Sequence, residues 1–129
     1  MTSISSLKIL IADDNKLSQI VLKKKLESAG ATVDVADDGT GVMRYLDDQD
    51  YDLIILDMYM PEMDGRETLS AIRKLDSPAK RSIPVIACTA SNMPGDELDT
   101  GDEAFQAITS KPVDFDQLLG IISRLTTNE

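Results

Sequence analysis

Short apolar runs alternate with longer amphipathic stretches along the whole chain, and this alternation limits the folds open to it. The runs fall at residues 8–12, 31–36, 53–56, 83–89 and 107–110. Residues 53–56 are apolar without a break, which is typical of a strand covered on both faces. Strands that alternate with helices favour a parallel sheet with helices on both sides. The sequence therefore predicts a single α/β domain over residues 1–129, with five strands and five helices.

The expected helices lie between the apolar runs and carry apolar residues on one side. The first ends at Ala29, just before Gly30. Its predicted buried residues share one stripe: Val21, Leu22, Leu26 and Ala29. The other helices are expected near residues 42–46, 64–75, 94–105 and 114–125, with a turn at 37–41 and a loop at 76–82. The fourth has two glycines and few apolar anchors, so we expect it to be the least stable element.

Composition excludes several classes of protein. No apolar run approaches the roughly 20 residues that span a bilayer, and the first residues lack the features of a signal peptide, so a cytoplasmic location is predicted. Cys88 is the only cysteine and there is no histidine, which excludes an internal disulfide and a zinc site. The formal net charge of -10 argues against direct binding to nucleic acid.

Polar side chains stand where four of the predicted strands end. Asp13 and Asp14 follow the first run, Asp57 follows the third, Thr89 ends the fourth and Lys111 follows the fifth. The carboxyl ends of parallel strands share one edge of the sheet, where α/β proteins bind ligands. A carboxylate at Asp57 can act there as a nucleophile, a metal ligand or both. The plainer alternatives are that one acid of the pair caps the first helix, that Thr89 is an ordinary strand end and that Lys111 is solvated.

Four segments carry a resemblance to a known family. They read Ile-Ala-Asp-Asp-Asn at 11–15, Leu-Asp-Met-Tyr-Met-Pro-Glu-Met-Asp-Gly at 56–65, Ala-Cys-Thr-Ala at 87–90 and Thr-Ser-Lys-Pro at 109–112. The chain resembles, over nearly its whole length, the CheY-like receiver domains of response regulators in two-component and phosphorelay signalling. The second segment is most similar to receivers of hybrid histidine kinases. The resemblance implies a flavodoxin-like, doubly wound parallel sheet with strand order 2-1-3-4-5.

The resemblance also implies a phosphoacceptor and a metal site. Asp57 would take a phosphoryl group from the phosphohistidine of a histidine kinase or a histidine phosphotransfer protein. Mg²⁺ would be held by Asp14, by Asp57 and by the backbone carbonyl of Tyr59, while Asp13 would act through water. A receiver of this kind takes part in its own phosphotransfer but is not a turnover enzyme.

Three further residues would serve the phosphoryl group. The resemblance implies that the hydroxyl of Thr89 and the amide of Ala90 bind it, and that Lys111 pairs with it. The chain departs from the family at Ile108, where an aromatic residue is usual. The usual coupling through that ring is therefore in doubt, and we expect residues 92–103 to carry the switch instead.

A docking surface is expected on the first helix. Leu17 lies at the edge of its predicted buried stripe, and Ile20 points nearly away from the stripe. With Pro112 on the other side of the site, they could present an apolar patch to a helix of the histidine-bearing partner. The alternative is that Leu17 packs at the helix edge and that Ile20 is an incidental exposed residue.

Two other functions remain as alternatives. A phosphohydrolase that passes through an aspartyl phosphate usually has a second acid two residues after the nucleophile, and Tyr59 stands at that position. A receiver-like domain that only binds partners is disfavoured by the intact set of acids. Whether the chain is a stand-alone regulator or a domain of a hybrid kinase stays open.

Overall fold

The computed structural model describes residues 6–57, 65–90, 107–111 and 114–126. Within these ranges only the backbone is described at the following positions: Ala79, Arg81, Thr89, Ala90, Ile108, Ser110 and Lys111. Tyr59, Pro112 and the expected fourth helix lie outside the described residues. In the part of the chain that is described, no helix is long and apolar enough to cross a membrane.

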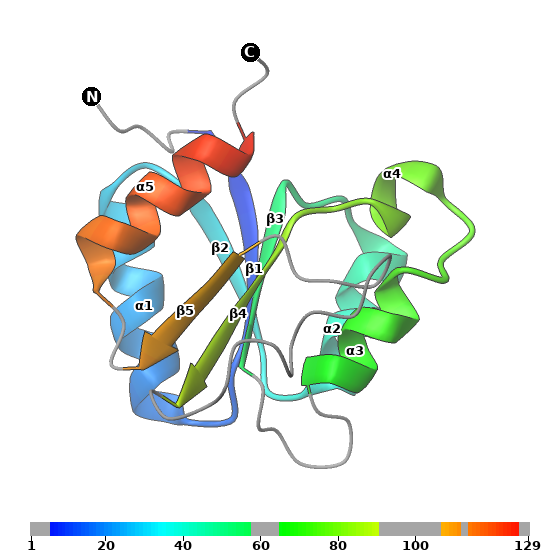
Figure 1. Cartoon of the computed structure of the whole chain (residues 1–129), viewed down its shortest axis with the longest axis horizontal. Helices are drawn as coiled ribbons and strands as arrows, with labels where there is room; N and C mark the ends of the chain where they lie inside the picture. The colour runs from blue at the N-terminus through cyan, green and yellow to red at the C-terminus, as the bar shows by residue number, and fades with distance from the viewer. Residues whose placement is uncertain (1–5, 58–64, 91–106, 112–113, 127–129) are drawn as a thin grey trace.

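The centre of the molecule is one sheet of parallel strands (Figure 1). The strands are β1 (Lys8–Ala12), β2 (Thr32–Ala36), β3 (Leu53–Asp57), β4 (Val85–Ala90) and β5 (Ala107–Lys111). Their order across the sheet is β2-β1-β3-β4-β5, which is the order expected from the resemblance. All four pairings are parallel, so the carboxyl ends of the strands meet at one edge.

Helices cover both faces of this sheet. They are α1 (Lys16–Ser28), α2 (Gly39–Asp48), α3 (Gly65–Ile72), the single turn α4 (Pro78–Arg81) and α5 (Phe115–Thr126). In Figure 1, α1 and α5 lie on one side of the sheet, and α2 and α3 lie on the other. The described residues thus form the three layers of a doubly wound α/β fold.

The unbroken apolar run in β3 is explained by its place between the two helical layers. Leu53 and Ile55 belong to the core shared with α1 and α5, whereas Ile54 and Leu56 belong to the core shared with α2 and α3. All four are at most 1 % exposed. Burying side chains of this size contributes about 1.5–3 kcal/mol each. A substitution by a polar residue at any of them would disrupt one of the two cores.

The buried stripe of α1 differs from the predicted one. Leu22 and Leu26 face the sheet as expected, but Val21 is 45 % exposed. Gln19 is buried instead and shares the inner face with Leu26 one heptad later. Val21 lines a pocket beside α1, where it stays partly exposed. Leu17 is 70 % exposed, so it projects further than a residue at the edge of the stripe would.

Several boundaries were predicted wrongly. α3 ends at Ile72 and not at Leu75, and capping side chains explain two further differences. α2 begins at Gly39, inside the predicted turn, because the Asp38 side chain accepts from the amide of Gly41 at 2.8 Å. The predicted loop 76–82 contains the turn α4, which Ser77 caps and Pro78 opens. At the end of α1 the expected stop holds, since Gly30 has a positive φ of 105°.

Candidate functional site

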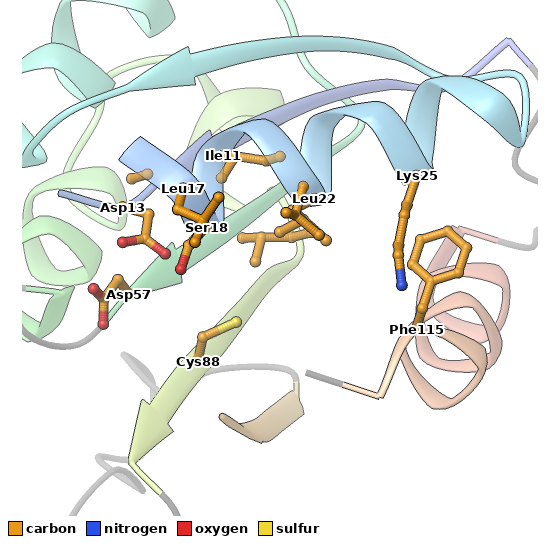
Figure 2. Close-up of a pocket in the computed structure, with 12 residues that line it drawn as sticks. Ile11, Asp13, Leu17, Ser18, Leu22, Lys25, Asp57, Cys88 and Phe115 are labelled. Atoms are coloured by element: carbon orange, nitrogen blue, oxygen red, sulfur yellow. The ribbon is translucent and has the colours of Figure 1, made fainter. Parts of the chain in front are cut away.

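The acids predicted from the sequence meet at the carboxyl edge of the sheet. Asp13 directly follows β1 and Asp57 ends β3, and these two strands are neighbours. One carboxylate oxygen from each of Asp13, Asp14 and Asp57 lies within 4.8 Å of the others. Figure 2 shows Asp13 and Asp57 side by side. Both are only 6 % exposed, while Asp14 is exposed to solvent.

A short turn fixes the first of these acids. The amide of Asn15 donates to Oδ1 of Asp13 at 2.9 Å, and the amide of Asp13 donates to the carbonyl of Ala36 at 3.2 Å. Asn15 itself caps α1, because its side chain accepts from the amide of Ser18 at 2.9 Å. The alternative that Asp13 or Asp14 is merely the cap of α1 is therefore wrong.

Gln19 is a site residue that the sequence reasoning missed. Its Nε2 donates both to the backbone carbonyl of Asp13 and, at 2.8 Å, to Oδ1 of Asp37. The same oxygen of Asp37 also accepts from Nζ of Lys16 at 2.7 Å. These bonds, that from Lys16 first, lower the pKa of Asp37. The available signal was the helical spacing that places Gln19 in line with Leu26 on the buried face.

The donor set suits a hard divalent cation. Carboxylate oxygens are the ligands that Mg²⁺ prefers, and it usually takes one or two of them together with water. Three carboxylate oxygens within 4.8 Å of one another can face one such ion. Like charges about 4 Å apart repel by roughly 1–4 kcal/mol between the dielectric of water and that of a protein surface, and a cation would remove this repulsion. The residues present therefore fit Mg²⁺.

The other predicted residues of the site are described only by their place in the chain. Thr89 and Ala90 end β4, and Ala90 is paired with Lys111 at the end of β5. Since Asp57 is paired with Cys88, all three reach the same edge of the sheet as Asp57. The roles assigned to their side chains and to the carbonyl of Tyr59 stay predictions.

A pocket of about 310 Å³ runs from the acids along the inner side of α1 (Figure 2). Asp13 and Asp57 lie at one end, and Lys25 lies at the other, with its Nζ 5.5 Å from the centre of the Phe115 ring. The wall between them is mostly apolar and includes Leu17, Val21, Leu22, Ile55 and Cys88. Among the described residues, the large hydrophobic side chains that stand exposed all belong to α1: Leu17, Ile20 and Val21.

Proteins with related sequences include a hybrid histidine kinase and a sensory/regulatory protein. The chain is 36 % identical over 120 residues to hybrid signal transduction histidine kinase K of Dictyostelium discoideum, covering 89 % of this chain and 10 % of the kinase. It is 29 % identical over 125 residues to the sensory/regulatory protein RpfC of Xanthomonas campestris, covering 97 % of this chain and 17 % of that protein. The chain thus spans less than a fifth of either relative.

Solved structures with the same fold are receiver domains. One is the receiver domain of a sensor histidine kinase from Pseudomonas aeruginosa, solved with a magnesium ion coordinated in the active-site cleft. It is 30 % identical, with a TM-score of 0.83 over 95 % of this chain and 98 % of that one. Another is the receiver domain of a Francisella response regulator, 28 % identical, with a TM-score of 0.82 over 94 % of this chain and 97 % of that one.

The sequence model of the response regulator receiver domain matches residues 9–123. This match covers all five strands except Lys8 at the start of β1, and it contains the three clustered acids. The chain therefore belongs to the response regulator receiver domain family of two-component signalling.

Proposed function

We propose that residues 1–129 form a single receiver domain that takes a phosphoryl group from a phosphohistidine onto Asp57 in the presence of Mg²⁺. The observation that carries this proposal is the meeting of three carboxylates at the carboxyl edge of the sheet, within 4.8 Å of one another. One of them, Asp57, ends the central strand and is nearly buried. In a receiver domain, a carboxylate in this position is suited to accept phosphate.

In the proposed transfer, a carboxylate oxygen of Asp57 attacks phosphorus and forms a new P–O bond. The bond from phosphorus to the histidine nitrogen breaks, and its electron pair stays on the imidazole ring. Asp14, Asp57 and the carbonyl of Tyr59 would hold Mg²⁺ directly, and Asp13 would hold it through water. The bound ion would neutralise the charge of the carboxylates and of the phosphoryl oxygens.

Residues at the ends of β4 and β5 complete the proposal. The hydroxyl of Thr89 and the amide of Ala90 donate hydrogen bonds to phosphoryl oxygens, and the ammonium group of Lys111 offsets their charge. The support is that Ala90 and Lys111 are register partners at the edge where Asp57 lies. Each domain accepts one phosphoryl group and loses it by hydrolysis or onward transfer, so it acts as a switch and not as a turnover enzyme.

The test of this function is phosphorylation by a small donor. Acetyl phosphate with Mg²⁺ should add one phosphoryl group to the protein, as read by mass spectrometry. Asp57→Asn should remove the added mass, whereas Asp52→Asn, at the opposite edge of the sheet, should keep it. Labelling of the Asp57→Asn protein to the wild-type level would overturn the assignment. Steady turnover of phosphate esters would favour a phosphohydrolase instead.

The partner that brings the phosphohistidine is proposed to dock on α1. Leu17 and Ile20 are 70 % and 53 % exposed, and Leu17 also borders the pocket that begins at Asp57. Together with Pro112 they would offer an apolar surface to a helix of a histidine kinase or a histidine phosphotransfer protein. Support for this class of partner comes from the relatives, which are histidine kinases and similar sensory proteins.

The docking proposal predicts different results with a protein phosphodonor and with a small phosphodonor. Ile20→Asp should change the free energy of unfolding by less than about 0.5 kcal/mol, since the residue is exposed. It should slow transfer from a phosphohistidine protein and leave labelling by acetyl phosphate unchanged. Thr40→Asp, which places the same charge on an exposed position of α2, is the matched control. Equal rates for the Ile20→Asp protein and the wild type with both donors would remove Ile20 from the docking surface.

A further inference from the structure

Gln19 is an uncommon residue for the inner face of a helix. It is only 7 % exposed, although the next residue, Ile20, and Lys16, about one turn earlier, are exposed. A buried amide is costly unless it is hydrogen-bonded. Here Nε2 meets two acceptors, the backbone carbonyl of Asp13 and Oδ1 of Asp37. Both hydrogens of the amide nitrogen are thus engaged, and they point to two different loops.

These two loops follow neighbouring strands. Asp13 belongs to the loop after β1, and Asp37 directly follows β2, which is paired with β1 along its whole length. The amide of Asp13 also donates to the carbonyl of Ala36. The peptide groups on both sides of the Asp13 α-carbon are therefore held, one by β2 and the other by Gln19.

We propose that Gln19 is a positioning residue for the acid site. By holding the carbonyl of Asp13, it fixes the direction in which the loop presents Asp13 and Asp14 toward Asp57. Three like charges within 4.8 Å repel one another, and an unrestrained loop would relax by moving them apart. The bond to Oδ1 of Asp37 keeps the amide of Gln19 in place. This inference rests on the proposed binding of Mg²⁺ by these acids.

The two hydrogen bonds of Gln19, to Asp13 and to Asp37, form a bridge that should couple these residues in both directions. If the arrangement held by Gln19 favours the bound cation, then the cation favours that arrangement in return. Binding of Mg²⁺ should therefore be sensed at Asp37, although Asp37 is not one of the clustered acids. The chemical shift of the Asp37 amide should move with Mg²⁺ in the wild-type protein and move much less when the bridge is removed.

The first experiment replaces Gln19 by Met, which has a similar length but donates no hydrogen bond. Isothermal titration with Mg²⁺ alone, without a phosphodonor, should give a dissociation constant raised about tenfold, as is typical when residues that orient metal ligands are lost. Lys16→Met is the matched control, because it removes the exposed bond to the same oxygen of Asp37. It should change the constant less than twofold.

A second control separates positioning from general loss of stability. Tyr51→Phe removes the bond from the Tyr51 hydroxyl to Asp34, away from the acid site. It should lower the melting temperature and leave the Mg²⁺ dissociation constant unchanged. If Tyr51→Phe weakens Mg²⁺ binding as much as Gln19→Met does, the effect of Gln19 is structural and the proposal is wrong.

A double-mutant cycle keeps the test decisive if Gln19→Met is poorly stable. Asp37→Ala alters only an exposed side chain and cuts the outer half of the bridge. It should weaken Mg²⁺ binding in the wild-type background and have no further effect in the Gln19→Met background. Additive effects would overturn the proposal. Failure of the wild-type protein to bind Mg²⁺ would instead overturn the proposed function, whereas equal binding by wild type and Gln19→Met would overturn this inference alone.

Discussion

The two edges of the sheet, where the parallel strands begin and where they end, bring together different kinds of polar and charged groups. Just before β3, the hydroxyl of Tyr51 donates to Asp34 in β2 at 2.6 Å, and at the start of β1 the amide of Lys8 donates to Asp52 at 2.8 Å. Nζ of Lys8 donates to Gln49 and lies 5.0 Å from the centre of the Tyr51 ring. Where the same strands end, three carboxylates are gathered together. The first edge joins each of these groups to a complementary partner, whereas the second brings three carboxylates together in a place that suits a cation.

The largest expected difference between the edges is their response to Mg²⁺. At about 100 times the dissociation constant, a ligand that binds only the folded state raises the free energy of unfolding by about 2.7 kcal/mol. Asp57→Asn should lose most of this rise, and Asp52→Asn at the opposite edge should retain it. Thermal unfolding across a Mg²⁺ titration measures both. The same rise in all three proteins would place the cation elsewhere.

The next largest effect is a loss of stability at the edge where the strands begin. Tyr51→Phe should lower the free energy of unfolding by about 1.5 kcal/mol, because a hydrogen bond to a charged group is lost. Burial, and then the bond to Asp34, raise the pKa of the Tyr51 hydroxyl. The stability that the neutral hydroxyl contributes is therefore complete below the unfolded pKa of about 10 and is lost as the pH rises above it.

The pH dependence gives this prediction its check. Urea unfolding of wild type and Tyr51→Phe should show a gap in stability that narrows as the pH rises above about 10, since only the wild-type protein has this hydroxyl to ionise. A gap that stays constant over that range would mean that ionisation of Tyr51 is not linked to folding.

A smaller effect, of opposite sign, is expected at the acid edge. Asp14→Asn removes one of three like charges, and Asp14 is exposed, so the metal-free protein should gain about 1 kcal/mol or less. The same change should weaken binding of Mg²⁺. Chemical denaturation in the presence of a chelator measures the gain, and titration calorimetry measures the loss. A variant that is destabilised without metal would show that repulsion is not the dominant force in the cluster.

The smallest contrast compares one lysine from each edge. Lys8 is half-buried, with an amide partner and an aromatic ring, so Lys8→Met should cost about 1 kcal/mol. Lys16 forms an exposed ion pair with Asp37, so Lys16→Met should change stability much less. High salt should leave the change in the free energy of unfolding caused by Lys8→Met nearly intact. It should abolish the small change caused by Lys16→Met. A larger loss of stability for Lys16→Met than for Lys8→Met would contradict the proposed difference between the two edges.

Local sequence was sufficient for the strands and for the cluster of acids. An unbroken apolar run that ends in Asp57 predicts both a buried strand and a functional carboxylate, and parallel pairing brings Asp13 and Asp14 to it. Both inferences depend only on burial and on the direction of the strands.

What the sequence could not provide depends on partners far along the chain. Gln19 can be buried because the carbonyl of Asp13 and the carboxylate of Asp37, 18 residues later, accept its hydrogen bonds. The early start of α2 required knowing that Asp38 caps it, because the glycines at 39 and 41 suggest a turn. The side-chain roles of Thr89 and Lys111 remain predictions, because they depend on geometry beyond the backbone register.

The alternation of side chains along β3 also determines how Asp57, the proposed phosphoacceptor, is held in place. Leu53 and Ile55 are fixed by one helical layer, and Ile54 and Leu56 by the other, so the strand that ends in Asp57 is clamped from both sides. A new charge on Asp57 therefore cannot be accommodated by sliding or tilting this strand. The chain must respond in the loops that face the carboxylate, and the amides of β3 should remain among the slowest to exchange with solvent in either state.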